Sequence, residues 1–277
     1  MTAKAINKIA ENAANNFYKL SIQISLNGLS FCQLDTVTNT VTASDGVIFH
    51  KELTPFQTLA ELKKLLEHNR VQQNTYYEVV VVHRNNLFSL VPEPLFSEDD
   101  LANYLKFNAK ILANDHIAYD EIEEHGFVNV YVPFVNINNY IYELFGEFVY
   151  KHHGTVVLQS LLNEKNTAKN PICYVHISEQ QLDITVISNK KLLLFNNFDF
   201  TTKEDFLYYL LFTIEQLKLD PETIQLRLFG EVEEEDHLYN LCYNYVKNVS
   251  IFQPSFNAEL MMAADSESID FTVLNAL

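Results

Sequence analysis

Two stretches of the sequence repeat one strand–turn–strand pattern, and this repeat constrains the fold more than any other feature. Residues 19–34 and 172–187 each alternate apolar and polar side chains in two runs joined by a short polar turn, which is typical of a β-hairpin. Ile22-Gln23-Ile24-Ser25 matches Val175-His176-Ile177-Ser178 at an offset of 153 residues (175 minus 22), and Leu29 matches Leu182 at the same offset. The chain is therefore predicted to consist of two related halves.

The first half is predicted to open with a three-stranded meander, followed by a helix and a buried strand. Thr54-Pro55 predicts the helix start, because threonine caps helices well and proline suits the first helical turn. The unbroken valines at 79–82 indicate a strand buried on both faces, as in a parallel sheet covered by helices. The meander strands are expected at 20–26, 29–36 and 40–50, with Asn27-Gly28 as the first turn.

The remaining segments are assigned by the same periodicities, and the second half follows the order of the first. In the first half, strands are expected at 87–91, 127–134 and 155–162, and helices from Ser97 and over 137–148. In the second half, strands are expected at 172–178, 181–187, 190–198, 223–229 and 249–252, and helices from Thr201 or Thr202, over about 233–245 and over 256–263.

These assignments predict an α/β protein of two tandem domains, each a mixed sheet flanked by helices. A flexible segment at 1–16 precedes a first domain at 17–162. The polar stretch 163–170 is the predicted linker, and residues 171–277 form the second domain, which ends in a polar tail.

Composition excludes several classes of partner. The chain carries 19 Lys and Arg against 36 Asp and Glu, a net charge of −17, which repels nucleic acid and anionic membranes. No apolar run approaches the roughly 20 residues that cross a bilayer. Cys32, Cys173 and Cys242 lack the Cys-x-x-Cys spacing of a metal or redox site and are expected to be buried thiols, which predicts a reducing, cytoplasmic location and no metal centre.

The order β-β-β-α-β-α-β, found twice, resembles the actin-like ATPase fold, in which two ribonuclease H-like domains face one another. Three stretches are also similar to a bacterial family of uncharacterised proteins with that fold, namely Ser89-Leu90-Val91-Pro92, residues 101–108 and Asn129-Val130-Tyr131-Val132-Pro133. The resemblance covers the chain from about residue 17. These motifs are structural, so they imply kinship and not a reaction.

The resemblance implies magnesium and phosphate positions on the opening hairpin of each half, where active relatives hold an Asp followed two residues later by a Gly. The matching positions here are Gln23 and Ser25 in the first half and His176 and Ser178 in the second. An uncharged amide and an imidazole are poor ligands for magnesium, which prefers carboxylate oxygen. Both metal-facing carboxylates are absent from these positions.

Two glycines could be remnants of phosphate-binding elements. Gly28 could be a remnant of a phosphate-binding loop or part of a simple hairpin turn. The hairpin turn is favoured because Asn-Gly is common in two-residue turns. Gly230 stands where the resemblance implies a strand ending in paired glycines. The five carboxylates that follow it would repel a nucleotide phosphate, namely Glu231, Glu233, Glu234, Glu235 and Asp236.

Other polar segments are interpreted as structural. Residues 115–125 hold several carboxylates and two histidines without a ligand spacing, which favours a solvated acidic loop. His152-His153 is expected at a helix end, and residues 83–86 in a polar turn. Some tyrosines in the helices are candidates for a partner surface, among them Tyr239, Tyr243 and Tyr245.

Two hypotheses of function follow. The first is a non-catalytic protein that keeps the actin-like architecture, binds no cofactor and works by binding an unknown protein partner, comparable to the actin-like components of pilus or secretion machines. The alternative is a divergent ATPase or small-molecule kinase that binds ATP and magnesium through an acid elsewhere, such as Asp35 or Asp183. Asp183 lies on the second strand of its hairpin.

Overall fold

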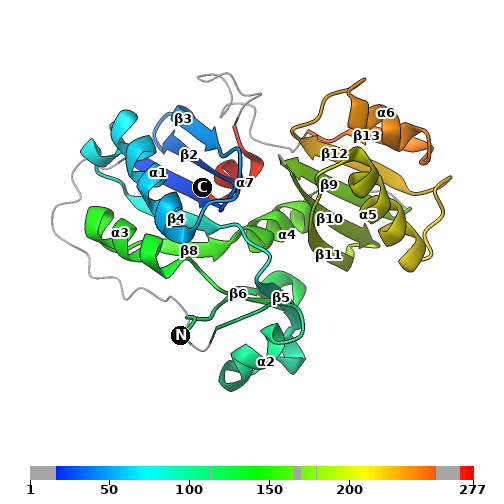
Figure 1. The fold of residues 1–277 in the computed structure, drawn as a ribbon, viewed down its shortest axis with the longest axis horizontal. Coiled ribbons are helices and arrows are strands. Elements are labelled where there is room, and N and C mark those ends of the chain that lie inside the picture. Colours follow the sequence, from blue (N-terminus) through cyan, green and yellow to red (C-terminus); the bar gives the residue numbers. More distant parts are fainter. Residues whose placement is uncertain (1–16, 113, 165–169, 179, 254–268) are drawn as a thin grey trace. The chain divides into compact units, whose positions relative to one another are not determined.

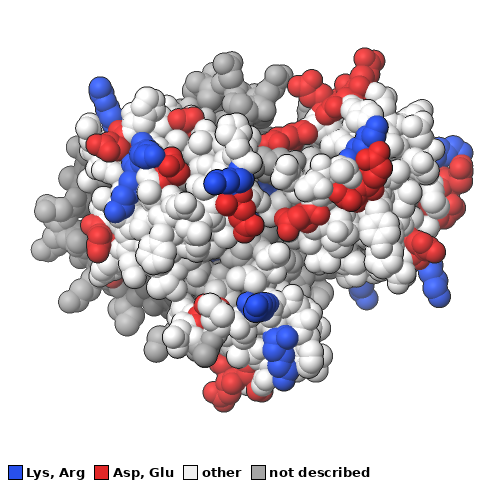
Figure 2. Space-filling view, viewed as in Figure 1, with Lys and Arg blue, Asp and Glu red and all other residues white. Residues whose placement is uncertain are grey.

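The computed structural model describes residues 17–112, 114–164, 170–178, 180–253 and 269–277. It is a mixed α/β protein with two five-stranded sheets and one three-stranded sheet (Figure 1). The chain divides into two compact units, Met1–Gln159 with Phe256–Leu277 and Ser160–Ser255, and each contains one five-stranded sheet. Acidic side chains lie on the visible face of both units (Figure 2). None of the described helices is long and apolar enough to cross a membrane.

The first unit is built around a mixed sheet whose central strand is the first of the chain. This strand, β1, pairs antiparallel with β2 and parallel with β4, and β8 extends the sheet parallel to β4. The strands in spatial order are β3 (Thr40–Ile48), β2 (Gly28–Asp35), β1 (Tyr18–Ile24), β4 (Glu78–His83) and β8 (Val149–His152).

Helices α1 (Pro55–His68) and α3 (Val135–Phe145) cover one face of this sheet. Thr54 caps α1 through a reciprocal capping box with Gln57, as the Thr-Pro start predicts. Because side chains alternate along a strand, every second residue of β1 points to these helices. The buried cluster on this face includes Leu20, Ile22, Ile24, Leu62, Leu66, Val79, Val81, Ile137 and Ile141.

The opposite face of the sheet carries the C-terminal helix α7 (Phe271–Asn275) and the start of α4 (His153–Asn163). Cys32 and Val41 of the sheet form one buried cluster with Val273 and Leu274 of α7. A second cluster joins Ala276 to three valines, Val80, Val82 and Val156. The first sheet is therefore covered on both faces, as the valine run at 79–82 predicts.

A three-stranded antiparallel sheet completes the first unit. Its strands are β5 (Phe88–Pro92), β7 (Phe127–Tyr131) and β6 (Ala118–Ile122), with β7 in the middle. Helix α2 (Leu101–Leu105) packs on this sheet through Leu105. The connections of this unit contain the 3-10 helices η1 (Val71–Gln73), η2 (Glu93–Leu95), η3 (Glu98–Asp100) and η4 (Glu123–His125).

The second unit repeats the first sheet strand by strand. Its central strand β9 pairs antiparallel with β10 and parallel with β12, just as β1 pairs with β2 and β4. Helices α5 (Lys203–Gln216) and α6 (His237–Tyr243) pack on one face in a single apolar cluster. The strands in spatial order are β11 (Lys191–Asp199), β10 (Gln181–Ser188), β9 (Ile172–Ser178), β12 (Gln225–Gly230) and β13 (Asn248–Ile251).

Three local predictions in the first half are wrong. Residues 155–162 lie in helix α4 and not in a strand, and their β-branched residues Thr155, Val156 and Val157 are buried there. The acidic segment 115–125 contains strand β6, which was predicted as a loop. His152 ends strand β8 and His153 begins α4, so these histidines do not lie at the C-terminal end of a helix, where an imidazole would interact favourably with the helix dipole.

The two units differ from the predicted domain limits. Residues 269–277 group with the first unit, whereas the sequence placed them in the second domain, because α7 packs on the first sheet. The boundary between Gln159 and Ser160 lies within α4, before the predicted linker at 163–170. Residues 1–16 and 165–169, the helix expected at 256–263 and the start of the predicted tail at 265–268 lie outside the described residues.

Candidate functional site

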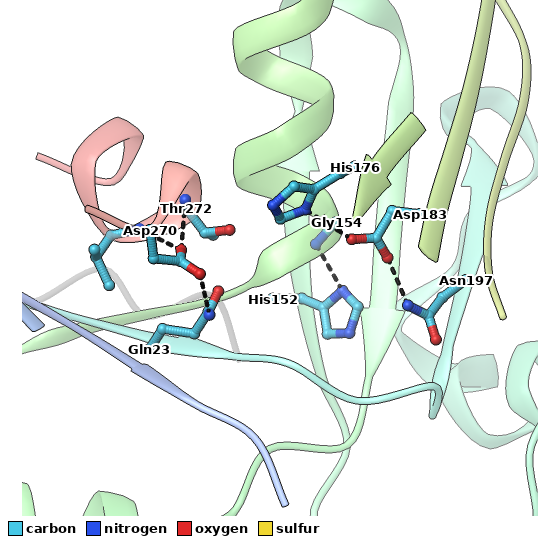
Figure 3. A network of polar contacts seen from close by, with 9 residues as sticks. Gln23, His152, Gly154, His176, Asp183, Asn197, Asp270 and Thr272 are labelled. Carbon is cyan, nitrogen blue, oxygen red and sulfur yellow. Dashed lines mark hydrogen bonds and ion pairs between the residues drawn. The ribbon is translucent and has the colours of Figure 1, made fainter. Parts of the chain in front are cut away.

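In the first unit, the magnesium position implied by the resemblance is occupied by a buried glutamine. Gln23 lies near the end of β1, pairs with Ser30 of β2 and Val82 of β4, and is 6% exposed. Its side-chain Nε2 donates a hydrogen bond to Oδ2 of Asp270 at 2.9 Å (Figure 3). Asp270 precedes α7, so the chain's own C-terminal segment supplies the partner of Gln23.

Asp270 also shapes the segment that carries it. Its Oδ1 accepts hydrogen bonds from the backbone N–H of Thr272 at 2.7 Å and of Val273 at 3.3 Å, which caps the first turn of α7. The same helix is tied to β1 by a hydrogen bond from the Ser21 hydroxyl to the Val273 carbonyl. Lys19 Nζ donates to the carbonyl oxygen of Leu277 at 3.3 Å. Three alternate residues of β1, on the face opposite α1 and α3, thus bind the C-terminal segment.

The first hairpin turn is held by the hydroxyl of Ser25. Ser25 Oγ accepts from the backbone N–H of Asn27 at 3.1 Å and of Gly28 at 2.8 Å. It donates to the Gly28 carbonyl at 3.1 Å. The two backbone N–H groups that would face a phosphate in a phosphate loop therefore have a partner inside the turn.

In the second unit, the corresponding position belongs to a row of polar and aromatic side chains across four strands. His176 of β9 pairs with Asp183 of β10 and Phe229 of β12, and Asp183 pairs with Asn197 of β11. His176 Nδ1 lies 3.1 Å from Asp183 Oδ2, and Asn197 Nδ2 donates to Asp183 Oδ1 at 2.6 Å (Figure 3). The imidazole stacks on the ring of Phe229 with centroids 4.8 Å apart.

This row gives Asp183 a defined environment. The carboxylate is 1% exposed, and each of its oxygens contacts a partner on a neighbouring strand. The equivalent position in the first unit, at the same offset of 153 residues (183 minus 30), is Ser30, which carries no charge. Sequence analysis named both His176 and Asp183, and the structure places them in contact. Ser178, the last residue of β9, pairs with Gln181 of β10. The turn between these two strands includes residue 179, which lies outside the described residues.

Gly230 is required by the geometry of the strand end. Its φ is +90°, in the region that favours glycine, and a Cβ added there would lie 2.1 Å from the carbonyl oxygen of Ile177. Gly230 pairs with Ile177, as His83 pairs with Ile24 in the first unit. The two halves therefore place different residues at the carboxyl end of this strand, a glycine in one and a histidine in the other.

His83 is a buried, neutral imidazole. Its Nδ1 accepts from the backbone N–H of Phe134 at 3.3 Å, so its Nε2 carries the proton that is donated to Asn138 Oδ1 at 2.9 Å. Burial lowers the pKa of His83 to about 4, against a smaller opposing effect of the Asn138 hydrogen bond. His83 thus ties β4 to the start of α3.

A half-buried carboxylate that the sequence pattern did not single out, Asp120, joins the three-stranded sheet to the main sheet. Asp120 accepts hydrogen bonds from the His152 backbone N–H at 2.8 Å, the Thr155 hydroxyl at 2.7 Å and the Tyr131 hydroxyl at 3.0 Å. Burial raises the pKa of Asp120 to about 6, although these three donors oppose the rise. The acidic surroundings of Asp120 in the sequence hid this role, although the apolar residues of the same short segment, Ala118, Tyr119 and Ile122, were an available signal of a strand.

The neighbouring His152 completes this network. Its Nδ1 accepts from the Gly154 backbone N–H at 3.2 Å and lies 3.1 Å from the Asn129 amide nitrogen. Its Nε2 therefore donates to the carbonyl of Asn85 at 3.0 Å. Among the described residues, no group of three His, Cys, Asp or Glu side chains is placed to hold a metal ion.

Solved structures share this fold. The structure of a Bacteroides thetaiotaomicron protein with an actin-like ATPase fold and unknown function is similar, with a TM-score of 0.78, 22% identity and coverage of 90% of this chain and 95% of that one. A chain of the PilM–PilN type IV pilus biogenesis complex is similar with a TM-score of 0.59, 14% identity and coverage of 94% and 97%.

The fold is therefore the actin-like ATPase fold, as the duplicated strand order predicts. No curated protein matches the sequence. The family model described as "Protein of unknown function (DUF3822)" matches residues 8–249, which cover most of both units. This chain belongs to that family.

Proposed function

We propose that this protein is a non-catalytic protein-binding or assembly factor that uses its former nucleotide positions to hold its own structure. The hydrogen bond from Gln23 to Asp270 carries the proposal, because an uncharged amide stands at the implied magnesium position and is tied to the C-terminal segment. Magnesium prefers several oxygen ligands with carboxylates among them. The Gln23 amide nitrogen, which faces Asp270, does not fit that role.

The second unit supports the same proposal. The buried Asp183 has His176 and Asn197 as partners, which suits a structural pair better than a metal ligand. The need for glycine at position 230 is explained by the close approach of its backbone to the Ile177 carbonyl, so a bound phosphate is not needed to explain it. The exposed carboxylates from Glu231 to Asp236 would repel a nucleotide phosphate.

The PilM–PilN structure supports an assembly role by analogy of fold. That complex is one of type IV pilus biogenesis, and one of its chains has the fold seen here. Because one fold hosts many functions, the analogy suggests a class of activity and not a partner. A cytoplasmic location is part of the proposal, since the three cysteines are free and buried.

Calorimetric titration of the full chain with ATP and magnesium tests this proposal. We expect no binding in the micromolar range, and no change when magnesium is withdrawn. Micromolar, magnesium-dependent binding would overturn it. Affinity copurification from native cells is the second measurement, and we expect it to return the same protein partner repeatedly.

One observation favours the alternative of a divergent ATPase. Asp270 brings a half-exposed carboxylate next to Gln23, so it could replace the acid that β1 lacks. In that case Asp270→Asn would abolish ATP turnover. Asp183→Asn provides the matched test in the second unit, and unchanged turnover in that variant would remove Asp183 as a candidate.

A further inference from the structure

Helix α5 presents an aromatic pair to solvent between two carboxylates. Glu204, Tyr208, Phe212 and Glu215 recur at spacings of four, four and three residues, which places them on one face of the helix. We call these four residues the α5 stripe. The opposite face of α5 is buried through Phe206, Leu210 and Ile214. The α5 stripe therefore occupies the solvent face of a typical amphipathic helix.

The aromatic residues of the α5 stripe are unusually exposed. Tyr208 is 60% exposed and Phe212 is 43% exposed, and their rings stack with centroids 5.7 Å apart and an interplanar angle of 19°. Neither residue belongs to the apolar cluster under α5. Two adjacent aromatic rings on a surface are the kind of side chain that dominates binding energy at protein interfaces.

The charge around these rings is negative. Glu204 and Glu215 lie at the two ends of the α5 stripe, and both are exposed. The neighbouring helix α6 shares the apolar cluster of α5, and the loop before it exposes Glu233, Glu234, Glu235 and Asp236. Figure 2 shows acidic side chains over the region of α5 and α6. Lys203 approaches Glu204 at 3.9 Å, an exposed pair that leaves most of this charge uncompensated.

We infer that the α5 stripe is a docking site for a basic amphipathic segment of another protein. Apolar side chains of that segment would pack on Tyr208 and Phe212, and its Lys or Arg residues would meet Glu204 and Glu215 and stack on the aromatic faces. A second copy of this chain is a poor occupant, because each copy carries a net charge of −17. Nucleic acid and anionic lipid are repelled for the same reason. The inference deepens the proposed protein-binding function and rests on it.

A designed peptide tests the chemistry of this site directly. The probe is a fluorescein-labelled peptide of about 14 residues, roughly four helical turns, with Leu at i, i+3, i+4 and i+7 spacing and Lys at the flanking positions. A peptide with Glu in place of every Lys is the control ligand. Fluorescence anisotropy with the full chain measures both at low and at physiological salt. We expect the Lys peptide alone to bind, more tightly at low salt.

Variants of the protein show whether binding occurs at the α5 stripe. Tyr208→Ala with Phe212→Ala removes both rings from an exposed helix face, and alanine favours the helix, so the fold is kept. The matched control is Phe56→Ala with Tyr142→Ala, two aromatic residues of the first unit that are 79% and 61% exposed. We expect Kd for the Lys peptide to rise about tenfold or more in the first variant and to stay within about twofold in the control.

Charge reversal supplies the second variant. Glu204→Lys with Glu215→Lys should raise Kd for the Lys peptide by a similar factor and allow the Glu peptide to bind. Equal affinity of wild type and both variants, or no binding of the Lys peptide to wild type, would overturn the inference. Such a result together with absent ATP binding would leave the proposed function standing and place its partner surface elsewhere.

Discussion

Gln23 and Asp270 are separated by 247 positions in the sequence, yet their side chains form a hydrogen bond of 2.9 Å in the first unit. Glutamine supplies the N–H that an aspartate needs, whereas an acid at position 23 would oppose Asp270. The glutamine at position 23 therefore helps to dock the C-terminal helix on the first sheet. The stability of a variant with an acid at position 23 therefore measures how strongly Gln23 and Asp270 depend on each other.

Gln23→Glu should destabilise the first unit. The substitution keeps the side-chain length but sets a second carboxylate against Asp270 in a buried place, which we expect to cost about 1–3 kcal/mol in the free energy of unfolding at neutral pH. The repulsion between the two carboxylates should add to this loss at neutral pH and disappear in strong acid. Chemical denaturation at several pH values measures it.

Gln181→Glu is the matched control. Gln181 Nε2 donates to Asp199 Oδ1 at 2.8 Å, so the control creates the same Glu–Asp pair on an exposed site of the second unit. Because water screens that pair, we expect the free energy of unfolding to change by less than about 0.5 kcal/mol. If Gln181→Glu lowered the free energy of unfolding as much as Gln23→Glu does, burial against α7 would not be the cause of the loss in Gln23→Glu.

Removal of residues 269–277 should uncover Cys32. This cysteine is 0% exposed, and it packs against Val273 and Leu274 of α7. Burial also raises its pKa to about 12, which keeps the thiol unreactive in the intact chain. We expect a thiol reagent to modify one cysteine rapidly in the truncated protein and none in the intact one. Cys173 and Cys242 lie in the core of the second unit and serve as internal controls. Reaction of all three, or of none, would contradict the assignment.

Gly230→Ala should be far more damaging than another glycine substitution with a similar backbone angle. At Gly230 a Cβ would clash with the Ile177 carbonyl, so we expect a loss of about 3 kcal/mol or more. Gly146 has a φ of +78° and no atom within 4 Å of its added Cβ. Gly146→Ala should therefore show only the strain of its own backbone conformation, with φ +78° and ψ −135°, about 1–3 kcal/mol, without a steric clash in addition. Thermal or chemical denaturation separates the two, and equal losses would refute the steric explanation.

Asp120 and His83 of the first unit should give opposite pH dependences of stability. Asp120 has a folded pKa of about 6, above its ordinary value of 3.8, so its contribution is present below about pH 4 and is lost as the pH rises through about 6. His83 has a folded pKa of about 4, below its ordinary 6.5, so its contribution is present above pH 6.5 and is lost as the pH falls through about 4. In wild type the two effects largely cancel.

Single variants should reveal each effect. Relative to wild type, His83→Gln should lose stability as the pH rises from about 4 to 6, by up to about 3 kcal/mol, because Asp120 then acts alone. Asp120→Asn should show the opposite slope in the same range. Denaturation at half-unit steps of pH measures both differences, and parallel curves for the three proteins would exclude the burial of these groups.

Much of this architecture follows from local pattern. The alternation from Leu20 to Ile24, repeated from Ile172 to Ser178, indicates a strand because side chains alternate between the faces of a sheet. Thr54-Pro55 and the capping box at Thr202 mark helix starts for equally local reasons. The duplicated order of strands, and with it the fold, could therefore be predicted.

Tertiary structure alone decided the contacts that give these positions their chemistry. Thr155 to Leu162 has the β-branched composition of a strand, yet it is helical because its apolar residues are buried in that form. Asp120 is tied into the fold although its neighbours in the sequence are acidic, because Thr155, Tyr131 and the backbone of His152 converge on it. The sequence determined that Gln23 and His176 occupy matching positions of the two hairpins, and the predicted second hairpin already set Asp183 opposite His176. Only the folded chain brings Asp270 to Gln23, since a contact between segments so far apart in the sequence depends on packing and leaves no periodic trace.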